Sequence, residues 1–207
     1  MEFLDYYDIN GNYLGKETRD KVHAEGLWHK TVHCWLYDDL GNVYFQLRAD
    51  TNKMYTTASG HVGAGETLNQ AFAREVKEEI GIDVEIENSK LIEIVVWKMD
   101  KKKADGTVWR DRAFSNVYAN RVSTKMKNFV FDAKEVTGLI KINAEKALKI
   151  LCKEITSATA TKITANKQEK IQISFDDFLI NPHEIGIIKY GRVLQFIIEE
   201  VKTQKRG

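Results

Sequence analysis

The stretch GHVGAGETLNQAFAREVKEEIG, from Gly60 to Gly81, constrains the fold of this chain more than any other segment. Apolar residues recur in it at helical spacing, and a glycine follows the last of them: Leu68, Phe72, Val76 and Ile80. A helix with one apolar face needs another layer to pack on. The stretch therefore predicts a helix from about Thr67 to Ile80 that lies on a sheet.

Three carboxylates share this helix with the apolar stripe. Glu75, Glu78 and Glu79 fall within an arc of roughly 100°, beside the stripe. Like charges at this spacing cost about a few tenths of a kcal/mol per pair, and a hard cation such as Mg²⁺ removes that cost. The alternative is a solvated acidic face balanced by Arg74 and Lys77. The helix alone leaves both interpretations open.

The residues around the helix complete a longer motif. Gly60 is followed by five residues and Glu66, then by seven residues and the run REVKEEIGI at 74–82. This spacing resembles the Nudix box, Gly-x5-Glu-x7-Arg-Glu-aliphatic-x-Glu-Glu-x-Gly-aliphatic, with every fixed position filled. Resemblance to the Nudix hydrolases implies an α/β/α sandwich with a mixed sheet, in which residues 60–82 form a loop, a helix and a loop.

The same resemblance implies a chemistry for the box. Nudix hydrolases cleave a diphosphate linked to another group with Mg²⁺ or Mn²⁺, so the expected substrate is a nucleoside diphosphate derivative or another organic diphosphate. Carried over by position, Glu78 and Glu79 are the principal metal ligands, and Glu75 is a further ligand or the base that activates water. Arg74 orients these carboxylates, and the backbone carbonyl of Gly60 completes the metal shell.

A second resemblance covers the region ahead of the box. Residues 8–48 are similar to the isopentenyl diphosphate isomerase branch of the superfamily, with landmarks at Asp8, Gly11, Gly15, Arg19, His23, His29, Trp35, Gln46 and Arg48. In that branch, histidines at about the places of His23, His29 and His61 hold a catalytic metal, which implies a second site for Mn²⁺, Zn²⁺ or Mg²⁺. The alternative is that these histidines line the pocket without a metal.

Departures from the isomerase pattern favour hydrolysis. Ser59 stands where the branch has its catalytic cysteine, and Ala113 falls where a glutamate is expected. A serine hydroxyl is a much poorer proton donor and acceptor than a thiol. Asp111 is an acid that can replace one metal ligand. Two alternatives remain beside the hydrolase: an isomerase-like protein acting on isoprenyl diphosphates, and a non-catalytic binding module, whose usual mark is loss of box glutamates.

Other residues suggest how a substrate is held. Arg48 and Lys53 match places where the isomerase-like branch grips diphosphate, although both also fit as solvated bases. The cationic run at Lys98, Lys101, Lys102 and Lys103 is more typical of a solvated hairpin tip than of a substrate funnel. For the aromatic residues Trp97, Trp109 and Tyr118, packing in the sheet is favoured over stacking on a base. We interpret His33 as a packed histidine.

Charge and length restrict the class of protein. The chain has 207 residues, with 31 basic and 30 acidic side chains, so charge indicates neither nucleic acid nor a membrane as a partner. Without a signal peptide or an apolar run long enough to span a bilayer, we expect a cytoplasmic protein. Cys34 and Cys152 are far apart, which favours reduced thiols in the core.

We expect one domain with three parts. Residues 1–27 form an N-terminal hairpin arm with a turn at Asn10-Gly11, residues 28–142 form the core, and residues 143–207 form a C-terminal helical extension that also holds a strand and is thus α/β. Strands are predicted at about 30–37, 43–48, 83–97 and 107–120. The extension should hold an Asn143-capped helix, the strand KIQISF, a polar connector at 156–170 and a final helix over 183–201. The stripe of that last helix predicts core packing, with a homodimer contact or a lid as the alternative: Ile185, Ile188, Val193, Phe196, Ile197 and Val201.

Overall fold

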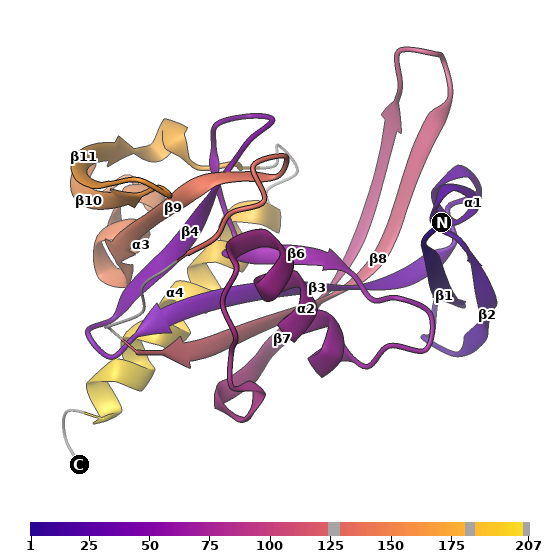
Figure 1. The fold of residues 1–207 in the computed structure, drawn as a ribbon, viewed down its shortest axis with the longest axis horizontal. Coiled ribbons are helices and arrows are strands. Elements are labelled where there is room, and N and C mark those ends of the chain that lie inside the picture. Colours follow the sequence, from indigo (N-terminus) through magenta and orange to yellow (C-terminus); the bar gives the residue numbers. More distant parts are fainter. Residues whose placement is uncertain (124–128, 181–184, 205–207) are drawn as a thin grey trace.

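One mixed sheet organises the fold (Figure 1). The computed structural model describes residues 1–123, 129–180 and 185–204, with the side chains of 185–189 outside this description. The strand order is β11-β10-β9-β4-β3-β1-β2, with β5 on β4, β6 and β8 on β3, and β7 on β8. The strands are β1 (Phe3–Tyr7), β2 (Tyr13–Thr18), β3 (Trp28–Asp38), β4 (Asn42–Arg48), β5 (Met54–Tyr55), β6 (Ala58–His61), β7 (Ser89–Lys102), β8 (Val108–Val122), β9 (Val136–Asn143), β10 (Ser157–Ile163) and β11 (Gln168–Ser174).

The pairing of β3 with β8 makes the sheet mixed. These strands are parallel, with His29 opposite Ala113 and Asp38 opposite Val122, whereas the other pairs are antiparallel. The long β7–β8 hairpin projects from the body beside the N-terminal arm (Figure 1). Strand β7 begins at Ser89, later than the predicted start at 83, because Asn120 donates to the carbonyl of Glu85 and holds a short 3-10 turn there.

The box helix is α2 (Leu68–Ile80), close to its predicted bounds. Thr67 caps its first turn in a reciprocal pair with Gln70, and Gly81 ends it at φ 75°. The apolar face is buried against β3 and β6 in a cluster that includes Ala71, Phe72, Val76, Ile80, Val32, Cys34, Leu36 and Ala58. Each large side chain buried here stabilises the packing by about 1.5–3 kcal/mol. This anchors the acidic face of α2 at the edge of the sheet.

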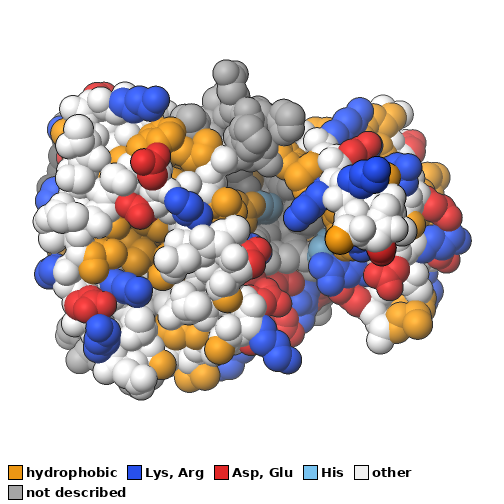
Figure 2. All heavy atoms as spheres, turned by 90° about the horizontal axis from the view of Figure 1, so that it is seen from above, with side chains coloured by type: hydrophobic (Ala, Val, Ile, Leu, Met, Phe, Trp, Pro, Cys, Tyr) orange, Lys and Arg blue, Asp and Glu red, His pale blue; other side chains and the backbone are white. Residues whose placement is uncertain are grey.

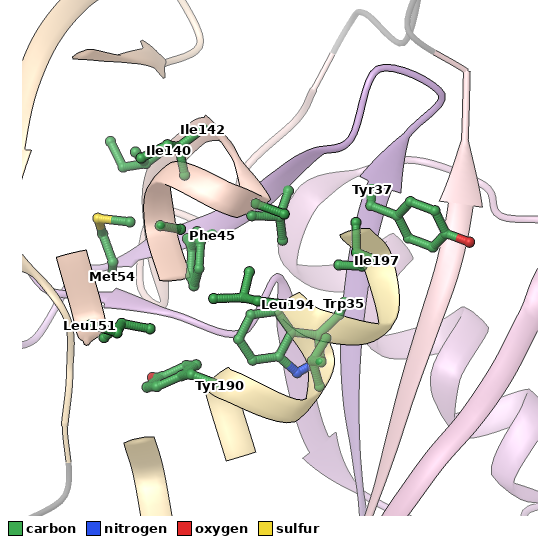
Figure 3. Packing of buried hydrophobic residues seen from close by; sticks show 14 of the residues in the cluster. Trp35, Tyr37, Phe45, Met54, Ile140, Ile142, Leu151, Tyr190, Leu194 and Ile197 are labelled. Carbon is green, nitrogen blue, oxygen red and sulfur yellow. The ribbon is translucent and has the colours of Figure 1, made fainter. Parts of the chain in front are cut away.

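The opposite face of the sheet carries the larger core (Figure 3). Helices α3 (Ala144–Leu151), capped by Asn143 as predicted, and α4 (Ile185–Gln204) pack on Trp35, Phe45 and Ile140. Val193, Ile197 and Val201 are buried here and Phe196 is partly buried, as expected for the final helix. The side chains of the other two predicted stripe positions, Ile185 and Ile188, lie outside the description, as do residues 183–184 of the expected helix.

Three expectations are wrong. The proposed connector at 156–170 contains most of the β10–β11 hairpin, because Ala158 and Ala160 alternate toward the larger core, while Ile163 packs in the cluster that contains α2. The C-terminal extension is α/β, as expected, but it holds a two-stranded hairpin where the single strand KIQISF was predicted. The arm at 1–27 includes an unpredicted helix, α1 (Arg19–Glu25), capped by Thr18. Cys34 is buried but Cys152 is exposed.

The elements form the predicted α/β arrangement with a mixed sheet, with α2 packed in one core cluster and α3 and α4 in the other. None of the helices in the described residues has the length and apolar character needed to cross a bilayer.

Candidate active site

A cleft of about 1590 Å³ runs between the N-terminal arm, the β7–β8 hairpin and the main body. Figure 2 shows a hollow between two lobes, with carboxylates gathered at its rim and histidine at its wall. The lining comes from distant parts of the chain, from Glu2 in the arm to Tyr190 in α4, and includes Gly60, Glu75 and Glu78 of the box. This size leaves room for a ligand larger than a bare diphosphate.

Arg74 binds the acidic groups of the box together. Its guanidinium donates to both oxygens of Glu66 at 2.9 Å, to Glu75 at 2.7 Å, to Glu78 at 3.0 Å and to the backbone carbonyl of His61 at 2.9 Å. The fork geometry of arginine permits this multiple contact, and these hydrogen bonds raise the pKa of Arg74. The side chains of Glu75 and Glu78 are thereby held at the wall of the cleft.

Two of the box glutamates are buried. Glu79 is 3% exposed and Glu75 is 8% exposed. Glu79 accepts from the Gln46 amide at 3.0 Å and from the Ser59 N–H at 3.2 Å. Burial raises the pKa of Glu75 to about 7 and that of Glu79 to about 8. Ionised carboxylates at such depth need a compensating cation.

The absence of a side chain at Gly60 makes room for the Glu75 carboxylate. A Cβ atom at position 60 would lie 2.1 Å from Oε1 of Glu75, so only glycine lets the carboxylate come this close to strand β6. Mg²⁺ and Mn²⁺ prefer oxygen ligands, and the Glu75 carboxylate and the adjacent backbone of β6 offer such oxygens close together. The donor set and its buried negative charge fit a divalent cation.

The raised pKa values predict how stability depends on pH in the absence of metal. Glu75 and Glu79 hold protons in the folded state that the unfolded chain has released, so the free energy of unfolding should fall as pH rises. Between pH 6.5 and 8 we expect a loss of about 1 to 2 kcal/mol.

Chemical denaturation in a chelator at several pH values measures this slope. The three buried histidines oppose this trend up to about pH 7.5, because their pKa values are lowered in the folded state while the unfolded imidazoles, with ordinary pKa values near 6.5, still release protons as pH rises. The expected loss is therefore the net of the two effects. Glu79→Gln should flatten the slope and Glu87→Gln, an exposed control, should leave it unchanged. A wild-type slope of zero contradicts the prediction.

A cluster of three histidines lies on the same cleft. Ring nitrogens of His23, His29 and His61 all lie within 4.8 Å of one another, contributed by α1, β3 and β6. Burial lowers the pKa of His23 to about 4 and that of His61 to about 2, and it also lowers the pKa of His29. The three imidazoles are therefore neutral near pH 7, which is the form that binds metals.

Two buried atoms beside this cluster have no hydrogen-bond partner. They are Nε2 of His29 and Oδ1 of Asp111, which lie 3.5 Å apart. Unpartnered buried polar atoms are rare, and three neutral imidazoles with one carboxylate fit a transition metal or Zn²⁺. Trp109 stacks on the His23 ring with centroids 3.7 Å apart, so the β7–β8 hairpin covers the cluster.

The residues that depart from the isomerase pattern also line the cleft. Ser59 is on β6 beside the box glutamates, and Ala113 is opposite His29 on the parallel strand. A methyl side chain at 113 and a hydroxyl at 59 thus occupy the places from which a glutamate and a cysteine would act.

The two basic residues that were predicted to bind phosphate, Arg48 and Lys53, lie in different places. Arg48 lines the cleft but is engaged by both oxygens of Asp50 at 2.9 Å. Lys53 is outside the cleft lining within the described part of the chain, and its ammonium donates to the carbonyl of Asp176. This placement opposes the assignment of Lys53 to phosphate, because its charge is directed into the C-terminal extension. Of the lysine run, Lys101 reaches the cleft.

Packing was predicted for three aromatic residues of the sheet and for His33, and the structure shows it for Tyr118 and His33. Tyr118 packs on Phe72 at 5.8 Å, and His33 is 9% exposed beside the Tyr55 ring at 5.9 Å. In contrast, Trp97 lines the cleft and Trp109 contacts His23.

Sequence reasoning missed several cleft residues. Glu135 precedes β9, lines the cleft and acts electrostatically on Glu75 and Glu79. Tyr55 lies beside Arg48, with the guanidinium carbon 5.8 Å from the ring centroid. Leu179, Ile180 and Tyr190 come from the extension. A lone acid in a loop and scattered apolar residues give no motif, so no sequence signal marks them.

Comparisons with known proteins agree with this geometry. The family model described as NUDIX domain matches residues 27–156. A protein of Clostridium acetobutylicum described as an uncharacterized Nudix hydrolase is 31% identical over 202 residues, which cover 91% of this chain and 94% of that protein. An isopentenyl-diphosphate Delta-isomerase of Mycolicibacterium vanbaalenii is 32% identical over 89 residues, 40% of this chain and 49% of that protein.

A crystal structure of a Deinococcus radiodurans protein has a similar fold. The TM-score is 0.53 at 19% identity, and the match covers 73% of this chain and 90% of that one.

Proposed function

This chain belongs to the Nudix family of hydrolases, and on that premise we propose that it is a Mg²⁺- or Mn²⁺-dependent enzyme that hydrolyses a small-molecule diphosphate. The substrate class is a nucleoside diphosphate derivative or another organic diphosphate. The observation that carries the proposal is a pair of buried carboxylates: Glu75, which Arg74 holds at the wall of a large cleft, and Glu79, which accepts from the N–H of the cleft residue Ser59.

Each box residue has a separate task in this proposal. Glu78 and Glu79, with the carbonyl of Gly60, hold the metal, and Arg74 fixes Glu75 by the 2.7 Å hydrogen bond. A bound divalent cation neutralises phosphate oxygens and makes a coordinated water more acidic. Glu75, whose pKa burial raises to about 7, is matched to accepting a proton from the attacking water near neutral pH. Glu135 is a second carboxylate in the cleft that can serve this purpose.

An assay of phosphate release tests the proposal. Purified protein is incubated with nucleotides, nucleotide sugars, dinucleotides and isoprenyl diphosphates in Mg²⁺, Mn²⁺ or chelator. We expect metal-dependent cleavage of at least one diphosphate. Absence of cleavage across this panel, or cleavage that survives chelation, contradicts the hydrolase assignment.

The histidine cluster favours a second metal site, and with it an isomerase-like alternative function. The unpartnered atoms of His29 and Asp111 support a site for Mn²⁺ or Zn²⁺ formed with His23 and His61. Isomerisation of an allylic diphosphate also needs a proton donor and a proton acceptor, and Ser59 and Ala113 do not supply them. Migration of the isoprenyl double bond in the same assay would restore this alternative.

Metal titration tests the second site directly. We expect calorimetry with Zn²⁺ to show one additional equivalent in the wild type that disappears in His61→Ala and remains in His33→Ala, a control histidine from the same cleft. Because the pKa values of His23 and His61 are lowered by burial, binding should weaken less than tenfold between pH 7 and pH 6. Equal stoichiometry in wild type and His61→Ala contradicts the site.

A further inference from the structure

Side chains of the C-terminal extension form one wall of the cleft. Leu179, Ile180 and Tyr190 line the same cavity as Glu75 and Glu78. All three lie beyond residue 156, where the match to the family model ends. The box therefore faces a wall that the matched family region does not supply.

Backbone and side-chain contacts fix this wall. The N–H of Leu179 donates to the carbonyl of Met54 at 2.8 Å, and Phe178 forms a parallel bridge with Met54. The Tyr190 hydroxyl donates to the carbonyl of Leu179 at 2.9 Å. Residues 178–180 are thereby tied both to strand β5 of the core and to helix α4, so the wall is preformed.

Two cleft residues of the core, Tyr55 and Val95, belong with this wall, because they pack against the same buried cluster. We call the five residues the apolar subsite: Tyr55, Val95, Leu179, Ile180 and Tyr190. Tyr190 belongs to the buried cluster around Trp35, and Tyr55, Val95 and Ile180 pack against that cluster while they also face the cleft. Leu179 is partly buried. None of these five side chains carries a charge at neutral pH.

Arg48 lines the cleft close to both groups of residues. Its guanidinium carbon is 5.8 Å from the Tyr55 ring centroid, and it acts electrostatically on Glu79. Asp50 already engages it through two hydrogen bonds. The cleft thus contains both the box carboxylates and an uncharged wall, with Arg48 beside Tyr55 of that wall.

We infer that the apolar subsite receives the organic group attached to the diphosphate, and that this group is an uncharged, largely apolar ring. The inference rests on the proposed function, because the box carboxylates must hold the diphosphate for its substituent to reach the wall. Apolar surface buried here contributes about 25 cal/mol per Å², and the Tyr55 ring adds stacking. A charged substituent would lose hydration without gaining a partner from these five side chains.

A binding experiment tests the subsite separately from catalysis. The probes are phenyl and methyl esters of methylenediphosphonate, which have equal charge and a P–C–P link that is not hydrolysed. Affinities are measured by calorimetry with Mg²⁺ in wild type and in Ile180→Asp. Ile9→Asp is the matched control, since Ile9 is 52% exposed in the turn of the N-terminal arm, away from the cleft.

We expect the wild type to bind the phenyl probe at least about tenfold more tightly than the methyl probe. Ile180→Asp should bring the ratio close to one with unchanged affinity for the methyl probe, and Ile9→Asp should keep the wild-type ratio. Ile180→Ser, a milder change at a partly buried position, should lower the ratio in the same direction if the aspartate variant fails to fold.

Three results would overturn the inference: equal affinity for both probes in the wild type, an unchanged ratio in the folded Ile180 variants, or binding of neither probe. Phosphate release from the corresponding phenyl and methyl diphosphates is scored independently. If the protein prefers the phenyl probe but releases no phosphate from any diphosphate, the subsite is supported and the hydrolase assignment is contradicted. If it hydrolyses diphosphates but does not prefer the phenyl probe, the hydrolase assignment is supported and the subsite is contradicted.

Discussion

Glu79→Gln is expected to reduce kcat/KM for the cleaved diphosphate by about 10³-fold while the fold is kept. The substitution preserves shape and the hydrogen bond to Gln46 or Ser59, but it removes a charge that is 3% exposed. Loss of a metal ligand at a reacting phosphate costs several kcal/mol of transition-state stabilisation, and about 4 kcal/mol corresponds to 10³ in rate.

The control for this variant is Glu87→Gln, which changes an exposed glutamate outside the cleft. Steady-state kinetics with saturating Mg²⁺ should show wild-type rates for the control. In chelator, Glu79→Gln should be at least as stable as the wild type at pH 8, because it removes an uncompensated buried carboxylate. A Glu79→Gln enzyme within tenfold of wild-type activity would remove Glu79 from the proposed metal site.

Arg74→Met is expected to lower both activity and stability. Without the guanidinium, Glu66, Glu75 and Glu78 lose the four hydrogen bonds that they accept from it. Removing one member of a buried ionic network typically costs 3–5 kcal/mol, and because the Arg74 side chain is 35% exposed we expect about 2 kcal/mol here. We expect kcat/KM to fall by about 10²-fold through misplacement of Glu75.

Two further variants distinguish a positioning role of Arg74 from a general effect of removing an arginine. Arg74→Lys keeps the charge but lacks the fork that contacts several carboxylates, so it should recover less than tenfold in kcat/KM. Arg121→Met removes a surface arginine that lies 3.6 Å from Asp39 with both side chains exposed, and it should change neither quantity measurably. If Arg74→Met matches Arg121→Met in denaturation and kinetics, Arg74 does not position the box.

The sequence contained the information for the fold wherever a strong local pattern existed. The stripe from Leu68 to Ile80 with its glycine stop predicted α2, and the asparagine cap at Asn143 predicted α3. It failed at 156–170 because the two residues of β10 that alternate toward the larger core, Ala158 and Ala160, are small and give only a weakly apolar pattern. The short helix α1 was missed since its seven residues depend on tertiary contacts for stability.

The charged half of the cleft was predictable and the apolar half was not. Box carboxylates and Arg74 follow one another at fixed spacing, so a single helix brings them together. Leu179, Ile180 and Tyr190 meet Tyr55 only after β10, β11 and α4 have packed on the core, and nothing in their local sequence marks a cleft. For Lys53 the prediction from sequence was too specific. Its position along the chain predicted a phosphate contact, but its ammonium donates to the carbonyl of Asp176 in the extension.

The lining of the cleft from Glu2 to Tyr190 has a consequence for synthesis on the ribosome. A nascent chain that has reached residue 156 already contains the whole box and the three histidines of the cluster, but it lacks the cleft residues Leu179, Ile180 and Tyr190. Chains are made from the N-terminus, at about 5–20 residues per second. The acidic helix is therefore synthesised several seconds before the residues that complete the cleft. Packing of α4 on the core is the step that completes it.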